Sequence, residues 1–412
     1  MAIFCKPISS KKRFIPHRKL FETYTFTLYD KAEKIPENDL LKLNPDNIFF
    51  NISFLNLIEN CKTIKVQMRY CIIYKNKLPI GFLYCQITDF NTGVFLELLK
   101  NENNDRSLNA IKLVEKFLIK NRHENLLRLF TCGNNLISGE HGFYFINTIS
   151  EKIKHQLVLQ TIDLISKEEN KTGMISAVLI KDFEEQLKPK QLFKNFKFEV
   201  FTVEPNLILE FPVQVNSLEE YVQLFSKKYR NRAKNIQKKF GDIDCKELNI
   251  SDIKTFEEEI YSLYLQVYKR AKFKLLQLPS NYFSECKLIF KDEFKVHGFF
   301  KNNQLVAFNS SFLLQTNVLE AHYIGINYEL NKEYELYQNT LCNIITLAIK
   351  QNKGVINFGR TAAEIKTTIG AKPKELYCYI KAQNTISKLV QKSLIKFLKP
   401  EDWIPRNPFK EE

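Results

Sequence analysis

Two stretches of the sequence, residues 67–90 and 294–315, each have the pattern of a β-hairpin, and they align with one another without a gap. In both, an apolar run rich in β-forming residues leads into a short polar turn and a second apolar run. Tyr74-Lys75-Asn76 matches Phe300-Lys301-Asn302, and Ile80-Gly81-Phe82 matches Val306-Ala307-Phe308. The repeat indicates two related domains in one chain, with chance similarity as the alternative for a match this short.

The segments after the two hairpins are also parallel. After the first we expect a helix near 108–118, a strand over 126–132, a helix near 148–168 and a strand over 174–181. After the second we expect a strand over 318–326, a helix near 334–351 and strands over 355–359 and 375–381. This order predicts the α/β fold class, with mixed α+β sheets in two tandem domains, 1–205 and 206–412.

The composition is that of a globular protein: 44% of the 412 residues are hydrophobic and 26% are charged. No apolar run approaches the ~18 residues of a membrane-spanning helix, and the N-terminus has no apolar core for a secretory signal. The nine cysteines lie far apart without a CxxC pair, which is typical of reduced thiols in a cytosolic protein. We therefore expect a cytoplasmic protein. Because no histidines pair and no carboxylate cluster accompanies one, we expect no metal site.

The clearest helix is expected over 217–240, where the capping box Ser217-Leu218-Glu219-Glu220 precedes an apolar stripe of helical period. Between residues 227 and 239 its surface carries seven cations and no acid: Lys227, Lys228, Arg230, Arg232, Lys234, Lys238 and Lys239. In a chain of net charge +15, this basic face is either a solvated surface or a landing site for a phosphate-rich or acidic partner, with Arg230, Arg232 and Lys234 as candidate contacts. Aromatic residues interleaved for base stacking are absent, so we expect no DNA partner.

A candidate binding site follows the strand expected over 355–359. Arg360 could clamp a phosphate or carboxylate, Glu364 could accept a proton, and Lys366 could neutralise an oxyanion. Ligands in open α/β sheets bind at the carboxyl ends of strands, which is where these residues lie. The alternative is a plain strand–turn–helix in which Arg360 and Glu364 form an i,i+4 ion pair.

Two further segments carry polar residues beside strands. Cys132 and His141 flank a glycine-containing loop, which favours a tight, ordered turn over a nucleophile with its base. In the strand over 318–326, alternation predicts that His322 and Tyr323 point to opposite faces. One of them could donate a proton, although a half-buried pair with its hydrogen bonds satisfied is the plainer interpretation.

Four segments of the second half occur in a fixed order. They are Lys228-Tyr229-Arg230-Asn231-Arg232-Ala233-Lys234, then Leu263-Tyr264-Leu265-Gln266-Val267-Tyr268-Lys269-Arg270, then the second hairpin, then Asn357-Phe358-Gly359-Arg360-Thr361 continuing to Lys366 and Gly370-Ala371. As an ordered set they resemble the Fem-like branch of the GNAT (acyl-CoA N-acyltransferase) superfamily, whose members often carry two tandem GNAT domains. The resemblance covers residues 215–382 and, in outline, 65–200, so the N-terminal domain would be a degenerate GNAT-like domain.

The resemblance implies an enzyme, an acyltransferase that moves an acyl group from a thioester to an amine. The donor's pantetheine arm would lie in a wedge between the strands over 318–326 and 355–359. Glu364 would be the base, Tyr323 the acid, and backbone N–H groups near Gly325 would face the oxyanion. Arg360 and Lys366 would hold donor or acceptor anions. No cofactor would be bound; acyl-CoA or an acyl carrier protein would be a co-substrate.

The sequence departs from the GNAT pattern where coenzyme A pyrophosphate usually binds, because Asn327-Tyr328-Glu329-Leu330-Asn331-Lys332-Glu333 has no glycine. An acyl carrier protein or a charged tRNA would need less of such a loop. We therefore keep three hypotheses: an N-acyltransferase acting on a long-chain amino lipid or similar amine, a tRNA-dependent aminoacyl transferase of the peptidoglycan type, and a non-catalytic binding protein. A helix expected over 385–398 could in addition rest on the inner face of an anionic membrane.

Overall fold

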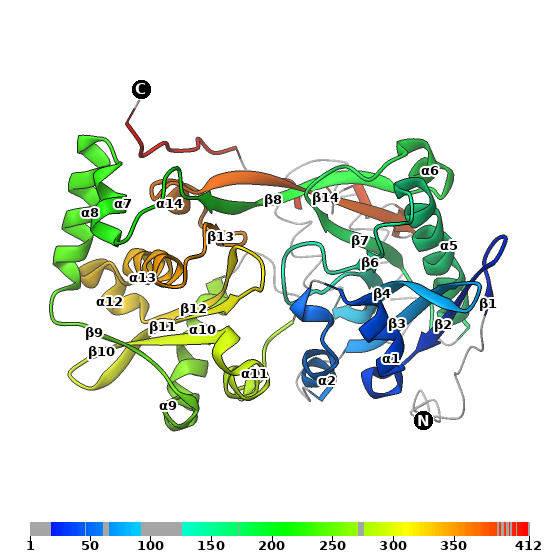
Figure 1. Ribbon diagram of the computed structural model, residues 1–412, viewed down its shortest axis with the longest axis horizontal. Helices are drawn as coiled ribbons and strands as arrows, with labels where there is room; N and C mark the ends of the chain where they lie inside the picture. The colour runs from blue at the N-terminus through cyan, green and yellow to red at the C-terminus, as the bar shows by residue number, and fades with distance from the viewer. Residues whose placement is uncertain are drawn as a thin grey trace. The chain divides into compact units, whose positions relative to one another are not determined.

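The computed structural model describes residues 18–45, 47–60, 66–91, 126–171, 173–270 and 276–384, with 387–388, 391–392, 395, 398–400 and 402–410. The chain forms two compact units (Figure 1): unit 1 is Met1–Val203 with Leu376–Pro400, and unit 2 is Glu204–Glu375 with Glu401–Glu412. We predicted one boundary, between residues 205 and 206. The chain passes into unit 2 after Val203, and it returns to unit 1 at Leu376, because β14 (Lys372–Ala382) pairs with β7 (Ala177–Phe183) through Tyr377–Ala382.

Unit 1 is a mixed sheet with helices on both faces. Its strand order is β1 (Arg18–Lys19), β2 (Tyr24–Tyr29), β3 (Val66–Lys75), β4 (Leu78–Asn91), β5 (Leu126–Cys132), β7 and β14, and β6 (Phe143–Phe145) pairs with β4. Helix α5 (Glu151–Glu169) packs Leu157, Ile162 and Ile165 into the core around Phe130 on one face. The other face carries α1 (Glu37–Leu43) and α2 (Ile52–Asn60), and α6 (Lys190–Asn195) follows β7. The helix expected near 108–118 lies outside the described residues.

Unit 2 repeats this plan. Its strand order is β8 (Glu199–Glu210), β13 (Val355–Asn357), β12 (Val318–Ile326), β11 (Gln304–Leu313), β10 (Phe294–Lys301) and β9 (Asp244–Glu247). Helix α13 (Leu336–Lys350) packs Leu341, Ile344 and Ala348 on Leu319 and Ile356 of one face. The opposite face is covered by α10 (Glu257–Arg270) and α11 (Tyr282–Phe290), which follow α9 (Ile250–Thr255).

The two hairpins share their turn and their irregularity. The residues at each tip, Asn76-Lys77 and Asn302-Asn303, all have positive φ (50°, 67°, 49° and 64°), which is the conformation of a type I′ turn. In each hairpin the register then shifts at the same place, between Ile73 and Tyr74 in β3 and between Phe299 and Phe300 in β10. The matched sequences therefore fold with matched backbone irregularities, as two related domains would.

The helix expected over 217–240 is divided into α7 (Leu218–Gln223) and α8 (Lys227–Phe240). Ser217 caps α7 as predicted, by accepting from the Glu220 amide at 3.1 Å. Between the helices, the C-terminal segment of the chain pairs with the backbone: Phe225 bridges Phe409, and the Ser226 amide donates to the Pro408 carbonyl at 2.8 Å. The apolar stripe continues through the break because Phe225 still points into the core, so periodicity alone could not detect it.

Candidate active site

The parallel strands β12 and β13 of unit 2 part from one another. Val318, Leu319 and Glu320 pair with Val355, Ile356 and Asn357, and there β13 ends. Strand β12 continues to Ile326, paired with β11, and within the described residues no strand pairs with its other edge over 321–326. We call this unpaired edge of β12 beyond the end of β13 the opening. It lies between the two strands where the family resemblance would place the donor's pantetheine arm.

A β-bulge shapes β12 at the start of the opening. Asn309 pairs with Ile324 and Ser311 with Ala321, so Ser310 faces both His322 and Tyr323. The Ser310 hydroxyl accepts from the Tyr323 amide (3.1 Å) and donates to the Tyr323 carbonyl (3.2 Å). The prediction that His322 and Tyr323 point to opposite faces is wrong, because the extra residue of the bulge interrupts strand alternation.

Both rings lie on the α10 and α11 side of the sheet. Their centroids are 4.5 Å apart, and both contact Tyr282 of α11. His322 Nε2 and the Tyr282 hydroxyl are in hydrogen-bond contact at 2.9 Å. Tyr323 lies edge-on to Tyr264 and Phe283, and burial raises its pKa far above that of a free phenol. Tyr323 therefore keeps its proton at physiological pH and can donate a hydrogen bond.

Sequence reasoning gave no role to Glu320 and Asn357, which lie at the mouth of the opening. Glu320 is only 7% exposed, and its Oε1 accepts from Asn357 Nδ2 at 3.1 Å. Asn357 Oδ1 in turn accepts from the Gly359 amide at 2.9 Å. The signal in the sequence was an acidic residue inside a mainly apolar strand, which is uncommon unless its carboxylate has a partner or a function.

The turn after β13 is held from inside by Lys366 of α14 (Ala363–Thr367). Its ammonium donates to the carbonyls of Phe358 (2.8 Å), Gly359 (3.4 Å) and Arg360 (2.6 Å), and the residue is 3% exposed. Burial lowers the pKa of Lys366 to about 7. We expected Lys366 to hold an anion. Because its donors point to these three carbonyls, the geometry is that of a positioning residue for the turn that carries Arg360.

Glu364, the base expected from the resemblance, is on the outer side of the same turn. Its carboxylate forms an ion pair with Arg406 of the C-terminal segment at 2.5 Å, and the side chains of Arg406 and Glu364 are 44% and 56% exposed. Gly325 lies in β12, beneath α10: a Cβ there would come 2.7 Å from Phe308 Cδ1 and 2.8 Å from the Leu263 carbonyl carbon. This glycine allows the helix to pack closely against the strand beside the opening.

The amino end of α13, where coenzyme A pyrophosphate would be expected, is occupied by the chain itself. Residues without glycine form α12 (Tyr328–Tyr334), which begins with Asn327 as its cap. The Asn331 side chain accepts from the Tyr337 amide in the first turn of α13 (2.9 Å), and Glu335 at the cap position pairs with Lys239 (3.0 Å). An anion placed here would meet the Glu335 carboxylate and fewer free N–H donors.

Comparison with solved structures identifies the fold. A tandem GNAT protein from the clavulanic acid biosynthesis pathway, solved without acetyl-CoA, matches 88% of this chain and 99% of its own chain, with a TM-score of 0.50 and 6% identity. The chain has the tandem GNAT fold. FemX (77% and 88% covered, TM-score 0.44, 10% identity) and L-PGS from Bacillus licheniformis (66% and 82% covered, TM-score 0.42, 11% identity) are also similar. No family model matches the sequence, and no curated protein does.

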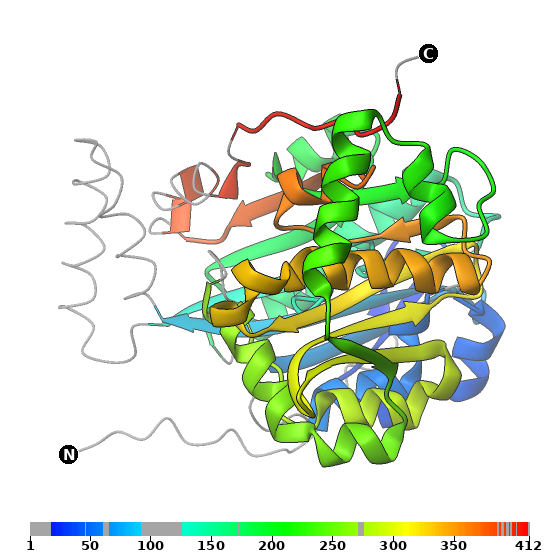
Figure 2. The same ribbon diagram turned by 90° about the vertical axis from the view of Figure 1, so that its left-hand side faces the viewer.

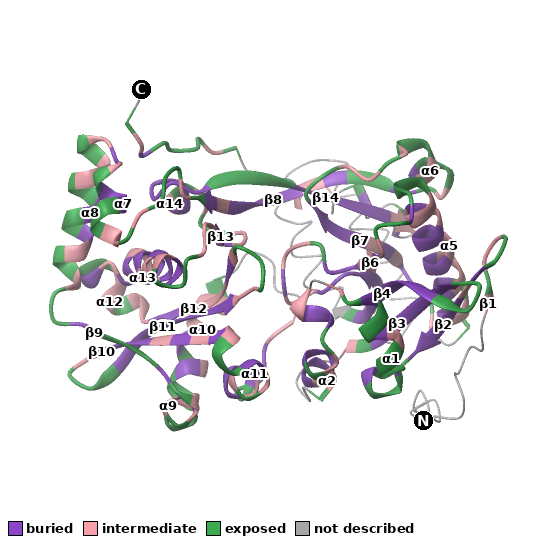
Figure 3. Ribbon diagram, viewed as in Figure 1, coloured by how far each residue is buried: buried purple, intermediate pink, exposed green. Residues whose placement is uncertain are grey.

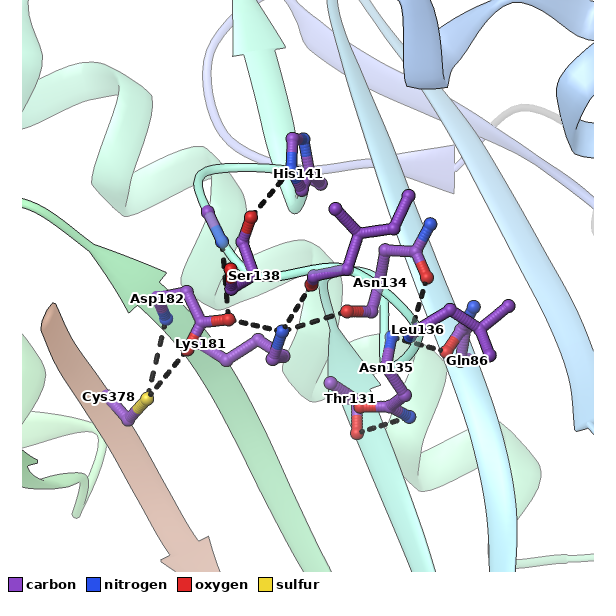
Figure 4. A network of polar contacts seen from close by, with 12 residues as sticks. Gln86, Thr131, Asn134, Asn135, Leu136, Ser138, His141, Lys181, Asp182 and Cys378 are labelled. Atoms are coloured by element: carbon purple, nitrogen blue, oxygen red, sulfur yellow. Dashed lines mark hydrogen bonds and ion pairs between the residues drawn. The ribbon is translucent and has the colours of Figure 1, made fainter. Parts of the chain in front are cut away.

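The two GNAT units differ at the position of the opening. In unit 1 the equivalent parallel strands, β5 and β7, stay paired from Leu129–Ala177 to Cys132–Ile180, the last residue of β5. Beyond them the buried Lys181 donates to the carbonyls of Asn134 (2.8 Å) and Ile137 (3.0 Å) and pairs with Asp182 (Figure 4). The chain's own loop therefore fills this place, which leaves unit 2 as the unit with an opening.

Cys132 and His141 belong to that closed loop. The Cys132 thiol is buried and donates to the Gly142 carbonyl, whereas His141 contacts the Ser138 carbonyl (3.1 Å) and Asn47 (2.9 Å). Burial lowers the pKa of His141 to about 4, so the ring is neutral. The tight-loop interpretation is confirmed, and the two side chains do not form a nucleophile–base pair.

The basic face formed by the seven cations of residues 227–239 lies on α8 of unit 2, which crosses α13 (Figure 2). Much of α8 is exposed (Figure 3). Of the three candidate contacts, Arg232 and Lys234 are exposed, and Arg230 donates to Gln223 at 3.0 Å. Within the described residues, Lys239 is the member of this face with an ion pair.

The described residues include no group of three or more His, Cys, Asp or Glu side chains placed to hold a metal. No helix among them has the length and apolar character to cross a membrane.

Proposed function

We propose that the chain is an N-acyltransferase that moves an acyl group from a thioester to an amine at the opening between β12 and β13. The end of pairing between these strands after Glu320 and Asn357, with the edge of β12 left unpaired beyond it, is the observation that supports the proposal most. A pantetheine arm inserted there would bond to the unpaired edge of β12 as an added strand does. The amine nitrogen would attack the carbonyl carbon, the C–S bond would break, and the thiolate would leave with a proton.

Two carboxylates compete for the role of base. Glu320 lies beside the opening, is nearly buried and is oriented by Asn357, whereas Glu364 is exposed and paired with Arg406. A base must lie within hydrogen-bond reach of the amine, directly or through one water, so this geometry favours Glu320. Tyr323 would protonate the leaving thiolate, backbone N–H groups near Gly325 would face the oxyanion, and Arg360 would bind an anionic group.

Helix α12 and the Glu335–Lys239 ion pair occupy the amino end of α13. This supports a donor whose negative charges bind at another part of the surface. The basic face of α8 lies beside that end, since Asn339 of α13 donates to the Ile236 carbonyl of α8 at 3.1 Å. An acyl carrier protein, which is acidic, would match this face better than coenzyme A alone would; an aminoacyl-tRNA is the second candidate donor on the same charge argument.

The aromatic side chains beside His322 and Tyr323 support an apolar acceptor, such as a long-chain amino lipid. The reaction would then take place in the cytoplasm, at the inner face of the membrane. The helix over 385–398, the expected membrane contact, lies largely outside the described residues.

The test is turnover by the purified full chain. Acyl-CoA, acyl carrier protein and aminoacyl-tRNA donors are each incubated with an amine panel that includes long-chain amino lipids, and products are identified by mass spectrometry. Amide formation from a thioester supports the proposal, and amide formation from aminoacyl-tRNA alone supports the second candidate. If no donor gives a product, the proposal fails, and the hypothesis of a non-catalytic binding protein is the one that remains.

A further inference from the structure

A pocket of about 360 Å³ lies at the other edge of unit 2, between strands β9 and β10 and the C-terminal half of α13. Sites for small molecules span about 300–1,000 Å³, so this volume suits a small metabolite. Cys245, His297, Asn343, Leu347 and Lys350 are among the side chains that line it. It lies on the α13 side of the sheet, whereas Tyr323 and Gly325 face α10 and α11, so it is distinct from the proposed transfer site.

Polar atoms without partners gather beside this pocket. His297 pairs with Asn309 across β10 and β11, and Asn309 donates to Asn343 of α13 at 2.9 Å. His297 Nδ1 and Asn309 Oδ1 are buried, and neither has a hydrogen-bond partner among the described residues. More than about 90% of buried polar groups in proteins are hydrogen-bonded, so two exceptions on neighbouring strands indicate a place adapted to something bound.

The side chains that line the pocket include one cation, Lys350, and one carboxylate, Glu247. The carboxylate of Glu247 forms an ion pair with Lys295 at 2.8 Å. Lys350 is exposed and makes no ion pair within the described ranges. Burial raises the pKa of the Cys245 thiol to about 11, and the charge of Lys350 acts both on this thiol and on the His297 ring. Burial is the main reason that the pKa of His297 falls to about 4, so the ring is neutral and can donate one hydrogen bond without adding charge.

We propose that this pocket binds a small organic monoanion, a carboxylate with a short apolar body. The carboxylate would lie on the Lys350 ammonium and the neutral His297 ring, and the apolar body would lie against Leu347 and the Cys245 thiol. One negative charge matches the single cation of the lining, which disfavours a phosphate or a dicarboxylate. The site is independent of the transfer activity, although α13, which forms one wall, also packs on β12 and β13.

Cys245 provides the measurement, since it is the exposed thiol among the seven cysteines of the described chain and lines the pocket. The rate at which N-ethylmaleimide modifies it is followed by peptide mass spectrometry, with acetate, butyrate or hexanoate present. We expect at least one carboxylate to slow modification, and butyramide, the neutral analogue of butyrate, to have no effect. Lys350→Gln should weaken this protection about tenfold, as loss of one charge-assisted hydrogen bond would.

Lys254→Gln, at an exposed position on α9, is the matched control and should keep full protection. Absence of protection by all three carboxylates would overturn the proposal. Equal protection by butyramide, or unchanged protection in Lys350→Gln, would overturn it as well, because the charge would then have no part in binding.

Discussion

The side-chain amide of Asn357 donates to the carboxylate of Glu320 (Nδ2 to Oε1, 3.1 Å), and these two residues form the last pair between β12 and β13 before the strands part. Asn357 also accepts from the Gly359 amide, at the start of the turn that Lys366 holds through three carbonyls. One amide therefore connects a nearly buried carboxylate with the turn that bears Arg360. This connection fixes the mouth of the opening without any ligand.

Glu320→Gln should lower kcat/KM for transfer by about 10²–10⁴-fold, the range for loss of a general base, because the amide cannot accept the amine proton. The carbonyl oxygen of the substituted side chain can still accept from Asn357, so the melting temperature should stay close to that of the wild type. Glu364→Gln is the matched comparison and should cost far less, since Glu364 is exposed. Steady-state kinetics over a range of pH measure both variants. A larger loss of kcat/KM in Glu364→Gln than in Glu320→Gln would assign the role of base to Glu364.

Lys366→Met should lower the free energy of unfolding by about 2 kcal/mol, because the carbonyls of residues 358–360 lose their donor. The pKa of Lys366 is about 7 in the folded protein and near 10.5 when unfolded, so between these values the unfolded state binds more protons. Wild-type stability should therefore rise from pH 7 to pH 10 relative to the variant, by on the order of 1 kcal/mol per pH unit. Urea denaturation at several pH values measures it; a constant difference would mean that the ammonium stays charged.

Arg232→Glu combined with Lys234→Glu should reduce transfer from an acyl carrier protein and leave transfer from a small thioester unchanged. Both side chains are exposed on α8, so reversing them should repel an acidic partner without disturbing the core. Kinetics at low and high salt measure the effect, which should shrink as salt rises because exposed charges are screened. Lys372→Glu combined with Lys374→Glu, both exposed on β14, serves as the charge-matched control, and an equal loss on both donors would contradict a docking role.

Gly325→Ala should destabilise unit 2 by about 1–3 kcal/mol, the usual cost of overpacking, because the added methyl group would meet Phe308 and the backbone of Leu263. Displacement of α10 should also disturb Tyr323, which contacts Tyr264 of that helix. Chemical denaturation and the near-ultraviolet signal of the tyrosines measure the two effects. A variant as stable as the wild type would show that α10 can move away from β12 at no cost.

Local chemistry in the sequence determined the repeated hairpins, the strand over 318–326 and the tandem organisation. Polar turn residues at 76–77 and 302–303 specify the tips of the hairpins, and alternating or continuous apolar runs specify the strands, because both signals depend on neighbours in the chain. The glycine-free segment before α13 folds as a helix, α12, with Asn327 as its cap.

Tertiary structure alone decided how the site residues are used. The bulge that turns His322 and Tyr323 to one face needs Ser310 on the neighbouring strand, and the burial of Lys366 needs carbonyls that only the folded turn presents. The end of α7 before Phe225 depends on residues near the C-terminus, far away in sequence. Glu320 meets Asn357 because two strands separated by α12 and α13 lie side by side before they diverge. Each of these features is a contact between distant parts of the chain, which residue periodicity does not encode.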